Sequence, residues 1–504
     1  MKNLRKSLTN LVNLNKICLR SVSLSNVEEK TADAKPWQEI PGPSSLPLIG
    51  QLHHFLPGGR LSNRNDFMTD FLYKKYGPIV RFDGNFAAPP MIILYDAEAS
   101  SKILRGENLM PVRPGFNALT YYRKQHNKQE GNPDATTGLI TDHGDAWKNF
   151  RLTVNPILMQ PQTVKLYRNS LTEVAEDMVK RMRKLRNDKN MIDGKFNVEM
   201  NLWALEAIGV VALGGRLNCL DLNLPKDSPA KKLISLVHEA FSLTEKLEFQ
   251  LSMWKYFATP TFKKAMKCYD EQRKLNIYFI TKAREELKKK QKSASDAKSV
   301  LEKLLDINET VALNMASDML FAGVDTSANT VTTLLYHLAT HPEKQSKLRK
   351  ELRSKDEKQS YLKACIKESL RLNPVVIGNL RLTTKEYNIL GYNIPKQMII
   401  VIGNQVMSMM EQHYPRPKEF IPERWLVDKS DPLCYSNAHP FAYAPFGFGS
   451  RACIGQRIAT LEIETFIATI IKNFEVEWFG PPPQIRVSTI NYFTEPYNFT
   501  FKDI

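Results

Sequence analysis

The stretch Phe446-Gly447-Phe448-Gly449-Ser450-Arg451-Ala452-Cys453-Ile454-Gly455 decides how this chain of 504 residues is read. It is a glycine-rich loop that runs directly into a helical pattern beginning at Gln456. Backbone N–H groups of such a loop, and the positive end of the following helix, favour the ionised form of the Cys453 thiol. Gly449 and Gly455 allow the backbone to approach a flat prosthetic group where a side chain would collide. The stretch therefore predicts a thiolate that ligates a metal; a structural cysteine in a turn is the alternative.

The spacing matches the pattern F-x-x-G-x-R-x-C-x-G, and on this stretch the chain resembles the cytochrome P450 family. At average residue usage the five fixed positions would match by chance in about one chain in ten thousand of this length, which disfavours the structural alternative. The resemblance implies that the loop binds haem b (iron protoporphyrin IX), with Cys453 as the iron ligand and Phe446 and Arg451 beside the cofactor. It also implies insertion of one atom of O2 into a substrate, at the expense of two electrons.

Composition predicts one large domain in a reducing compartment. Apolar residues make up 42% of the chain, and we find no linker or repeat that divides it. The six cysteines show no metal-finger spacing. The net charge of +17 calls for an acidic partner, an anionic membrane or nucleic acid. No nucleic-acid motif accompanies the charge, so nucleic acid is not expected as a partner.

The N-terminus has the composition of a mitochondrial transit peptide. Basic residues and an apolar helical stripe precede the first acidic residue, Glu28, and no run approaches the length needed to span a bilayer. We assign residues 1–30 to this leader and residues 36–504 to the haem-thiolate domain; a basic disordered tail is the alternative. The protein is then expected as a peripheral protein on the matrix side of the inner mitochondrial membrane.

Periodicity predicts a mostly α, α+β fold. Residues 140–372 show almost continuous helical spacing of apolar positions. Strand-like segments occur at 78–82, 91–94 and 387–401, and near the C-terminus. This arrangement agrees with the helical prism of the family, in which haem is buried between the cysteine loop and a distal helix.

Further segments match the family in the expected order. Trp147 and Arg151 lie one helical turn apart, and the resemblance implies that they bind a haem propionate, as do Arg381 and Arg451. A partly exposed amphipathic helix would explain the first pair equally well, and any single arginine could lie at the surface.

A second set of residues is implied to be structural. Glu368 and Arg371 form an i, i+3 pair, usually a modest surface feature. By resemblance, they form a buried triad with Arg424 that holds the loop of Cys453. Losing one partner of such a triad would leave buried charge unpaired.

The segment 320–327 is implied to handle oxygen. Glycine followed by Asp325 and Thr326 favours a local opening of the helix, since a threonine hydroxyl can bond a backbone carbonyl. In the family this acid–alcohol pair delivers protons to oxygen. An ordinary core helix with a tolerated glycine is the alternative.

Three basic residues suggest where electrons enter. Lys363 and Lys367 lie one turn apart, and Arg457 follows the cysteine loop. In mitochondrial members such residues dock an adrenodoxin-like 2Fe–2S ferredoxin, which is reduced by an NADPH-dependent ferredoxin reductase. Gln456 departs from this pattern, because many mitochondrial members have a second basic residue there.

The substrate is expected to be a lipophilic small molecule. Strings such as 111–116 and 378–381 resemble insect mitochondrial members linked to xenobiotic oxidation, with a steroid or ecdysteroid hydroxylase as the alternative. Segment 249–257 is either a membrane-surface contact near the substrate entrance or a core helix, and a monomer is expected. By family position, the residues expected to line the distal pocket are Phe116, Phe321, Ala322, Val375, Val376, Ile377 and Phe493.

One departure opens an alternative of another class. Residues 353–360 form a shorter connection than relatives usually have, beside the expected ferredoxin face. A degenerate haem protein that sequesters a hydrophobic ligand is therefore the non-catalytic alternative.

Overall fold

A computed structural model of the chain describes residues 34–62, 70–85, 88–192, 196–289, 298–354, 358–487 and 490–504. The predicted leader, residues 1–30, lies outside these ranges, as do residues 355–357 of the shortened connection. The helices are α2 (Leu72–Tyr76), α3 (Ala97–Gly106), α4 (Asn117–Gln129), α5 (Gly144–Leu158), α6 (Pro161–Lys165), α7 (Arg168–Leu185), α8 (Phe196–Leu213), α9 (Pro229–Thr244), α10 (Pro260–Lys289), α11 (Val300–Leu305), α12 (Glu309–Ala339), α13 (Pro342–Arg353), α14 (Ser360–Leu372), α15 (Asn404–Met407) and α16 (Gln456–Asn473). The strands are β1 (Lys35–Pro36), β2 (Ile79–Phe82), β3 (Met91–Leu94), β4 (Asn379–Leu382), β5 (Tyr387–Ile389), β6 (Tyr392–Ile394), β7 (Ile399–Ile402), β8 (Phe474–Trp478), β9 (Ile485–Arg486), β10 (Tyr492–Phe493) and β11 (Phe499–Asp503).

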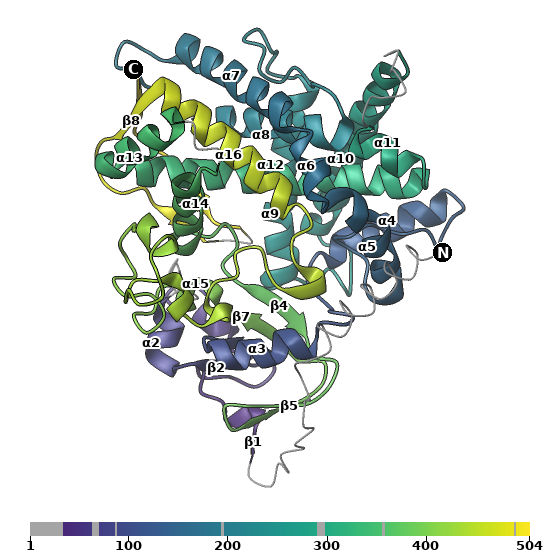
Figure 1. The fold of residues 1–504 in the computed structure, drawn as a ribbon. Helices are drawn as coiled ribbons and strands as arrows, with labels where there is room; N and C mark the ends of the chain where they lie inside the picture. Colours follow the sequence, from purple (N-terminus) through teal and green to yellow (C-terminus); the bar gives the residue numbers. More distant parts are fainter. Residues whose placement is uncertain are drawn as a thin grey trace, which may run out of the picture.

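The architecture is mostly helical with small sheets, as the sequence predicts. Helices α7, α8, α10, α12 and α16 gather in the upper part of Figure 1, and the sheet containing β2, β4 and β7 lies below them. The predicted helical region begins with α5 and ends with α14, and the strand-like segments coincide with β2, β3, β5–β7, β10 and β11.

The largest sheet brings distant basic residues together. Its order is β2-β3-β7-β4, with β3 and β7 parallel and the other pairs antiparallel. Arg381 lies on β4 opposite Ile400. The backbone N–H of Leu382 donates to the carbonyl oxygen of Val112 at 2.9 Å, which holds the segment before α4 against this edge strand. Arg113 is thereby placed near Arg381.

Helices α8 and α12 form the centre of the core. Among the described residues, α8 is the helix long and apolar enough to cross a membrane, but 89% of it is buried inside the fold, as expected of a core helix. A Cβ added to Gly323 of α12 would lie 2.7 Å from Cγ1 of Ile208 on α8. Gly323 is therefore needed for the close approach of the two helices.

The short connection between α13 and α14 is bridged by a side chain. The carboxylate of Glu351 in α13 accepts hydrogen bonds from the backbone N–H groups of Tyr361 (2.6 Å) and Leu362 (2.9 Å) at the start of α14. A negative charge at a helix N-terminus is stabilising because it satisfies free N–H groups there. The Glu351 side chain thus links the two helices directly, on either side of the short connection formed by residues 353–360.

Candidate active site around Cys453

The loop before α16 is held in place from a distant part of the chain. Gly447 and Gly449 have positive φ angles of 76° and 70°, which favour glycine. The backbone N–H and hydroxyl of Ser450 donate to the side-chain and backbone oxygens of Asn108, at 2.8 and 2.6 Å. A Cβ on Gly449 would lie 1.8 Å from Oδ1 of Asn108, so a side chain there would break this contact. The backbone N–H of Cys453 donates to the carbonyl oxygen of Phe446 at 2.8 Å, which closes the loop.

We infer that Cys453 borders a space inside the protein, because the residue is accessible although protein atoms surround it. The residue is exposed, unlike the other described free cysteines, which are buried, yet burial raises the pKa of its thiol. The backbone N–H groups of Gly455 and Gln456, and the charges of Arg151 and Arg113, act in the opposite direction and lower this pKa. The loop backbone therefore lowers the pKa of the thiol as predicted, but burial raises this pKa by more. A metal ion on the sulfur would supply the positive charge that favours the thiolate.

Four arginines crowd around this space: Arg113, Arg151, Arg381 and Arg451. Burial is the largest cause that lowers the pKa of each guanidinium. Repulsion by neighbouring arginines adds to it for Arg151, Arg381 and Arg451, and the pKa falls to about 10 for Arg381 and about 8 for Arg451. Within the described ranges, none of the four forms an ion pair with a carboxylate. This charge is suited to an anionic ligand.

Arg451 is fixed by the start of α5. Its guanidinium donates to the carbonyl oxygens of Leu139 (2.7 Å) and Asp142 (2.8 Å), and it lies 4.3 Å from the centre of the Trp147 ring. Nδ1 of His143 lies 3.1 Å from the same guanidinium. Burial, and then Arg451 and Arg113, lower the pKa of His143 to about 4, so the neutral imidazole accepts this hydrogen bond.

Of the buried donors without a hydrogen-bond partner among the described residues, three belong to the predicted propionate-binding residues: Nε1 of Trp147, Nε of Arg151 and Nε of Arg381. Buried donors are normally satisfied. Unpaired donors, uncompensated positive charge and a thiol facing the same space fit a metal-centred cofactor that carries carboxylates. Phe446 is partly buried and packs against the core beside this space.

The predicted triad is assembled, with full burial of all three side chains. The carboxylate of Glu368 accepts two hydrogen bonds from Arg371 (2.9 and 2.8 Å) and one from Arg424 (2.9 Å). A fourth partner is not among the predicted residues: Nε1 of Trp425, which donates at 2.9 Å. Arg371 also donates to the carbonyl oxygens of Ser408, Pro417 and Glu419, so its remaining N–H groups are satisfied.

The predicted oxygen-handling residues lie in the middle of α12. The hydroxyl of Thr326 donates to the carbonyl oxygen of Ala322 at 2.7 Å, as the sequence suggests. The helix is nevertheless continuous through residues 320–327, so no break accompanies this bond. The carboxylate of Asp325 is fully buried, and it contacts His238 of α9 and Tyr492 of β10.

The predicted pocket residues separate into two places. Phe116 and Phe321 contact each other edge to face, with ring centres 6.1 Å apart, and Phe241 of α9 stacks on Phe321 at 4.6 Å. Ala322 and Val376 are exposed, Ile377 is intermediate and Val375 is buried. Phe493 is not brought together with the aromatic pair. The centre of its ring lies 5.7 Å from that of Tyr336. Tyr336 follows Phe321 by fifteen residues in α12, which places it about 20 Å further along the helix.

The predicted docking residues lie on the surface. Lys363 and Lys367 are exposed on α14, and Arg457 is exposed at the start of α16, where it donates to the carbonyl oxygen of Met159. Nζ of Lys367 lies 5.4 Å from the Trp425 ring.

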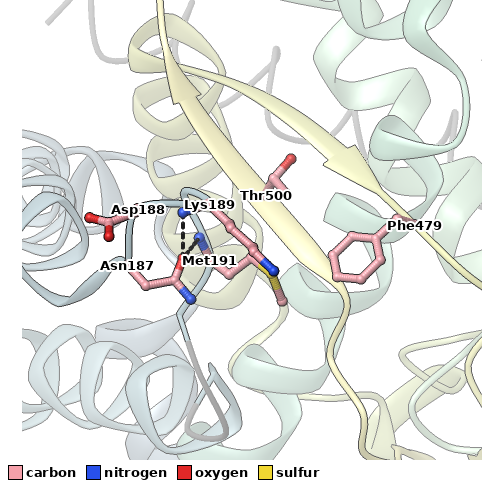
Figure 2. Close-up of a pocket in the computed structure, with 6 residues that line it drawn as sticks. All are labelled: Asn187, Asp188, Lys189, Met191, Phe479 and Thr500. Atoms are coloured by element: carbon pink, nitrogen blue, oxygen red, sulfur yellow. Dashed lines mark hydrogen bonds between the residues drawn. The ribbon is translucent and has the colours of Figure 1, made fainter.

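A separate surface hollow of 690 Å³ contains none of the predicted residues. Figure 2 shows that Asn187 closes a turn there by accepting hydrogen bonds from the N–H groups of Lys189 (2.9 Å) and Met191 (3.1 Å). The hollow is lined by Asn187, Asp188, Lys189, Met191, Phe479 and Thr500. These contacts form a local turn and carry none of the features found around Cys453.

Comparison with known proteins gives the same family along the whole chain. A family model described as Cytochrome P450 matches residues 40–501. "Cytochrome P450 CYP12A2" of Musca domestica is 38% identical, over 98% of this chain and 96% of its own length. "Cytochrome P450 12b1, mitochondrial" of Drosophila acanthoptera is 33% identical, over 90% of this chain and 88% of its own length.

Removal of the buried carboxylate tests the triad. We expect Glu368→Ala to destabilise the fold by about 3–5 kcal/mol, because it leaves two guanidinium groups buried without a counter-charge. Soluble yield and the midpoint of urea unfolding, followed by circular dichroism, measure the loss.

The matched control is another i, i+3 pair, Arg416 and Glu419, which is exposed on the surface. Glu419→Ala should leave the unfolding midpoint almost unchanged, because water screens exposed pairs. Equal effects of the two substitutions would show that burial of the triad does not matter.

Proposed function

The chain belongs to the cytochrome P450 family, whose members bind haem b through a cysteine thiolate, and we propose that Cys453 is the residue that ligates the iron here. As a family member it is a monooxygenase. The observation that carries the assignment is the Cys453 thiol beside a cluster of four arginines, none of which has a carboxylate partner among the described residues; Arg151 and Arg113 act on the thiol directly. Residues 36–504 then form the haem-thiolate domain.

The proposed reaction is R–H + O2 + 2 e⁻ + 2 H⁺ → R–OH + H2O. When bound, the haem supplies the chemistry of oxygen activation and carbon oxidation. Trp147, Arg151, Arg381 and Arg451 would bind its propionates, together with Arg113, and Phe446 would pack beside it. The sequence offered a signal for Arg113: an arginine between two prolines in an otherwise apolar segment.

Within this reaction the protein itself must hold and move protons. Asp325 is buried in α12 next to Thr326, whose hydroxyl stays close to the helix backbone. We assign these two residues to proton delivery. Glu368, Arg371 and Arg424 have no chemical role in this proposal; they hold the segment that leads to the loop of Cys453.

The proposed substrate is a lipophilic small molecule, with xenobiotic oxidation as the role. The aromatic contact of Phe116 with Phe321, extended by Phe241, supports an apolar distal wall. Ala322, Val376 and Ile377 would complete it, with Val375 behind them. Phe493 is left out, because its ring packs against Tyr336.

The proposed electron donor is an adrenodoxin-like 2Fe–2S ferredoxin, reduced in turn by an NADPH-dependent reductase. Exposure of Lys363, Lys367 and Arg457, and the net charge of +17, support an acidic partner. The name of the Drosophila acanthoptera relative includes the word mitochondrial. With the leader composition of residues 1–30, this supports a place on the matrix side of the inner mitochondrial membrane.

Membrane contact is proposed through the segment that follows α9. Of the two sequence expectations, the core helix is wrong, because residues 250–257 are not helical. Trp254 stacks on Phe262, which anchors the segment. Four apolar side chains are exposed around it: Phe249, Leu251, Tyr256 and Phe257. Apolar and aromatic groups of this kind are suited to a membrane interface.

The axial ligand is tested by Cys453→Ser. The purified wild-type protein should show the thiolate-type Soret band in its reduced carbon-monoxide spectrum, and the variant should lose it, because a serine hydroxyl is not a thiolate. Cys434→Ser, in the same region of the chain, should keep the band. Wild-type protein that holds haem without this band would favour the degenerate homologue, and a band retained in the variant would contradict the assignment of Cys453.

The substrate class is tested by spectral titration of the haem-loaded protein. Lipophilic xenobiotics should produce broad shifts from low to high spin, because they displace water opposite the thiolate in a permissive apolar pocket. An ecdysteroid precursor is the matched comparison. A tight and selective shift with the precursor would contradict the xenobiotic role and favour steroid hydroxylation.

The docking surface is tested by reversing its charge. Lys363→Glu combined with Lys367→Glu should raise the KM for the ferredoxin about tenfold at low salt, and salt should have less effect on the variant. Lys385→Glu is the control, since Lys385 is exposed and also lies over an aromatic ring, but near β5. An equal rise in the control would show a general charge effect and would contradict a specific docking surface.

A further inference from the structure

The buried acid of α12 is held by residues from two other elements. Oδ2 of Asp325 lies 3.2 Å from Nδ1 of His238 on α9. The hydroxyl of Tyr492 on β10 donates to the same oxygen at 3.3 Å. The other oxygen, Oδ1, is buried and has no hydrogen-bond partner among the described residues. One carboxylate oxygen is therefore engaged, and the other remains free to accept or donate a proton.

His238 connects this buried acid with water. Its side chain keeps 37% of its surface exposed, whereas the side chain of Asp325 has none. A proton that reaches Asp325 from water along the contacts described here must therefore pass through His238 or Tyr492. Burial and the nearby Asp325 raise the pKa of Tyr492, so Tyr492 stays protonated and cannot store or release a charge near neutral pH.

The second ring nitrogen of His238 has a partner that serves both protonation states. Nε2 lies 3.1 Å from Nδ2 of Asn201 on α8, and Asn201 is buried. An amide can donate to the neutral imidazole through its nitrogen. Turned over, the amide oxygen, which has no partner among the described residues, can accept from Nε2–H of the imidazolium and of the neutral ring that remains once Nδ1 has given up its proton. This site can therefore tolerate gain and loss of a proton by His238.

The electrostatic surroundings favour the protonated form of His238. Burial is the largest influence and lowers its pKa, but the hydrogen bond and charge of Asp325 together outweigh burial and raise the pKa. The next charged groups, Arg486 and Glu245, pair with each other at 3.5 Å and act on Tyr492. The imidazolium is thus present below the raised pKa and is lost as the pH rises through it.

The same face of α9 contacts the proposed substrate pocket. His238 and Phe241 lie one turn apart on α9, and Phe321 and Asp325 lie one turn apart on α12. Phe241 stacks on Phe321, while His238 pairs with Asp325. A substrate that moves α9 would therefore move the histidine relative to the acid.

We propose that His238 is a positioning residue that supplies protons from water to Asp325. The imidazolium passes its Nδ1 proton to Oδ2 of Asp325. The carboxyl group then rotates about its Cβ–Cγ bond and releases this proton toward Thr326, and Nδ1 of the neutral imidazole takes up another proton from water. This inference rests on the proposed function, because Asp325 has a use for protons only if O2 is reduced beside it. His238 itself touches neither substrate nor cofactor in this scheme.

The first test is His238→Gln, which keeps a polar side chain but cannot titrate. With ferredoxin, reductase and a substrate identified by spectral titration, turnover should fall about a hundredfold or more, as expected for a lost proton-transfer group. Product formed per NADPH should fall too. In the wild type, turnover should decline as the pH rises through the pKa of His238, and the variant should lose this limb. An unchanged carbon-monoxide spectrum shows that the variant is folded and loaded.

Tyr492→Phe is the matched control, because it removes a hydrogen bond to the same carboxylate oxygen without removing a titrating group. It should keep the pH limb of the wild type. A His238→Gln variant with wild-type turnover and pH profile would overturn the proposal. So would loss of the limb in both variants, since that would indicate a structural effect on Asp325.

The second test does not depend on turnover. NMR titration of the His238 imidazole in the ferrous carbon-monoxide form should give a pKa above the ordinary value, and Asp325→Asn should lower it. Equal pKa values in the two proteins would overturn the coupling. A second outcome separates the relay from the proposed function. If Asp325→Asn lowers the pKa of His238 but the wild type oxidises no substrate, the ion pair between His238 and Asp325 is confirmed. The proposed function and the proton relay that rests on it are then both wrong.

Discussion

The segment that leads to the loop of Cys453 is anchored on one buried carboxylate, that of Glu368. Its two arginine partners are equally buried. One carboxylate faces two guanidinium groups, so the cluster carries a net positive charge that is shielded from solvent. The cluster is stable because backbone carbonyl oxygens accept the remaining N–H groups of Arg371 and Arg424. Each of these carbonyls fixes a point of the segment between α15 and η5 (Pro422–Trp425) relative to α14. Trp425 then packs against Tyr443, three residues before Phe446.

The space above the thiol is bounded by groups whose charges do not cancel within the protein. Arginines from the segment before α4, from α5, from β4 and from the loop itself converge there, although they are far apart in sequence. Such crowding costs free energy in the protein alone. A ligand with two carboxylates would offset that cost, so the same residues both destabilise the cofactor-free site and select the cofactor. Helix α12 supplies a buried acid, Asp325, whose surroundings come from α9 and β10.

The sequence was most predictive where chemistry requires a fixed local pattern. The loop of Cys453, the pair Glu368 and Arg371, and the main helices and strands follow from spacing, and the structure brings the triad together as expected. Contacts between distant segments were not readable. Arg113 comes near Arg381 only because Val112 pairs with β4, and His238 meets Asp325 only because α9 packs on α12. Phe493 lies on a strand as expected, and nothing in the sequence indicated that its ring would contact Tyr336.

In the proposed function, Cys453 and the arginines around it belong to one cofactor site. The most direct measurement is a crystal structure of the haem-loaded protein. We expect Sγ of Cys453 bound to the iron, with the propionates within hydrogen-bond distance of Trp147 and of the arginines that now lack a counter-charge. An iron ligated by another residue, or propionates directed away from these arginines, would contradict the account.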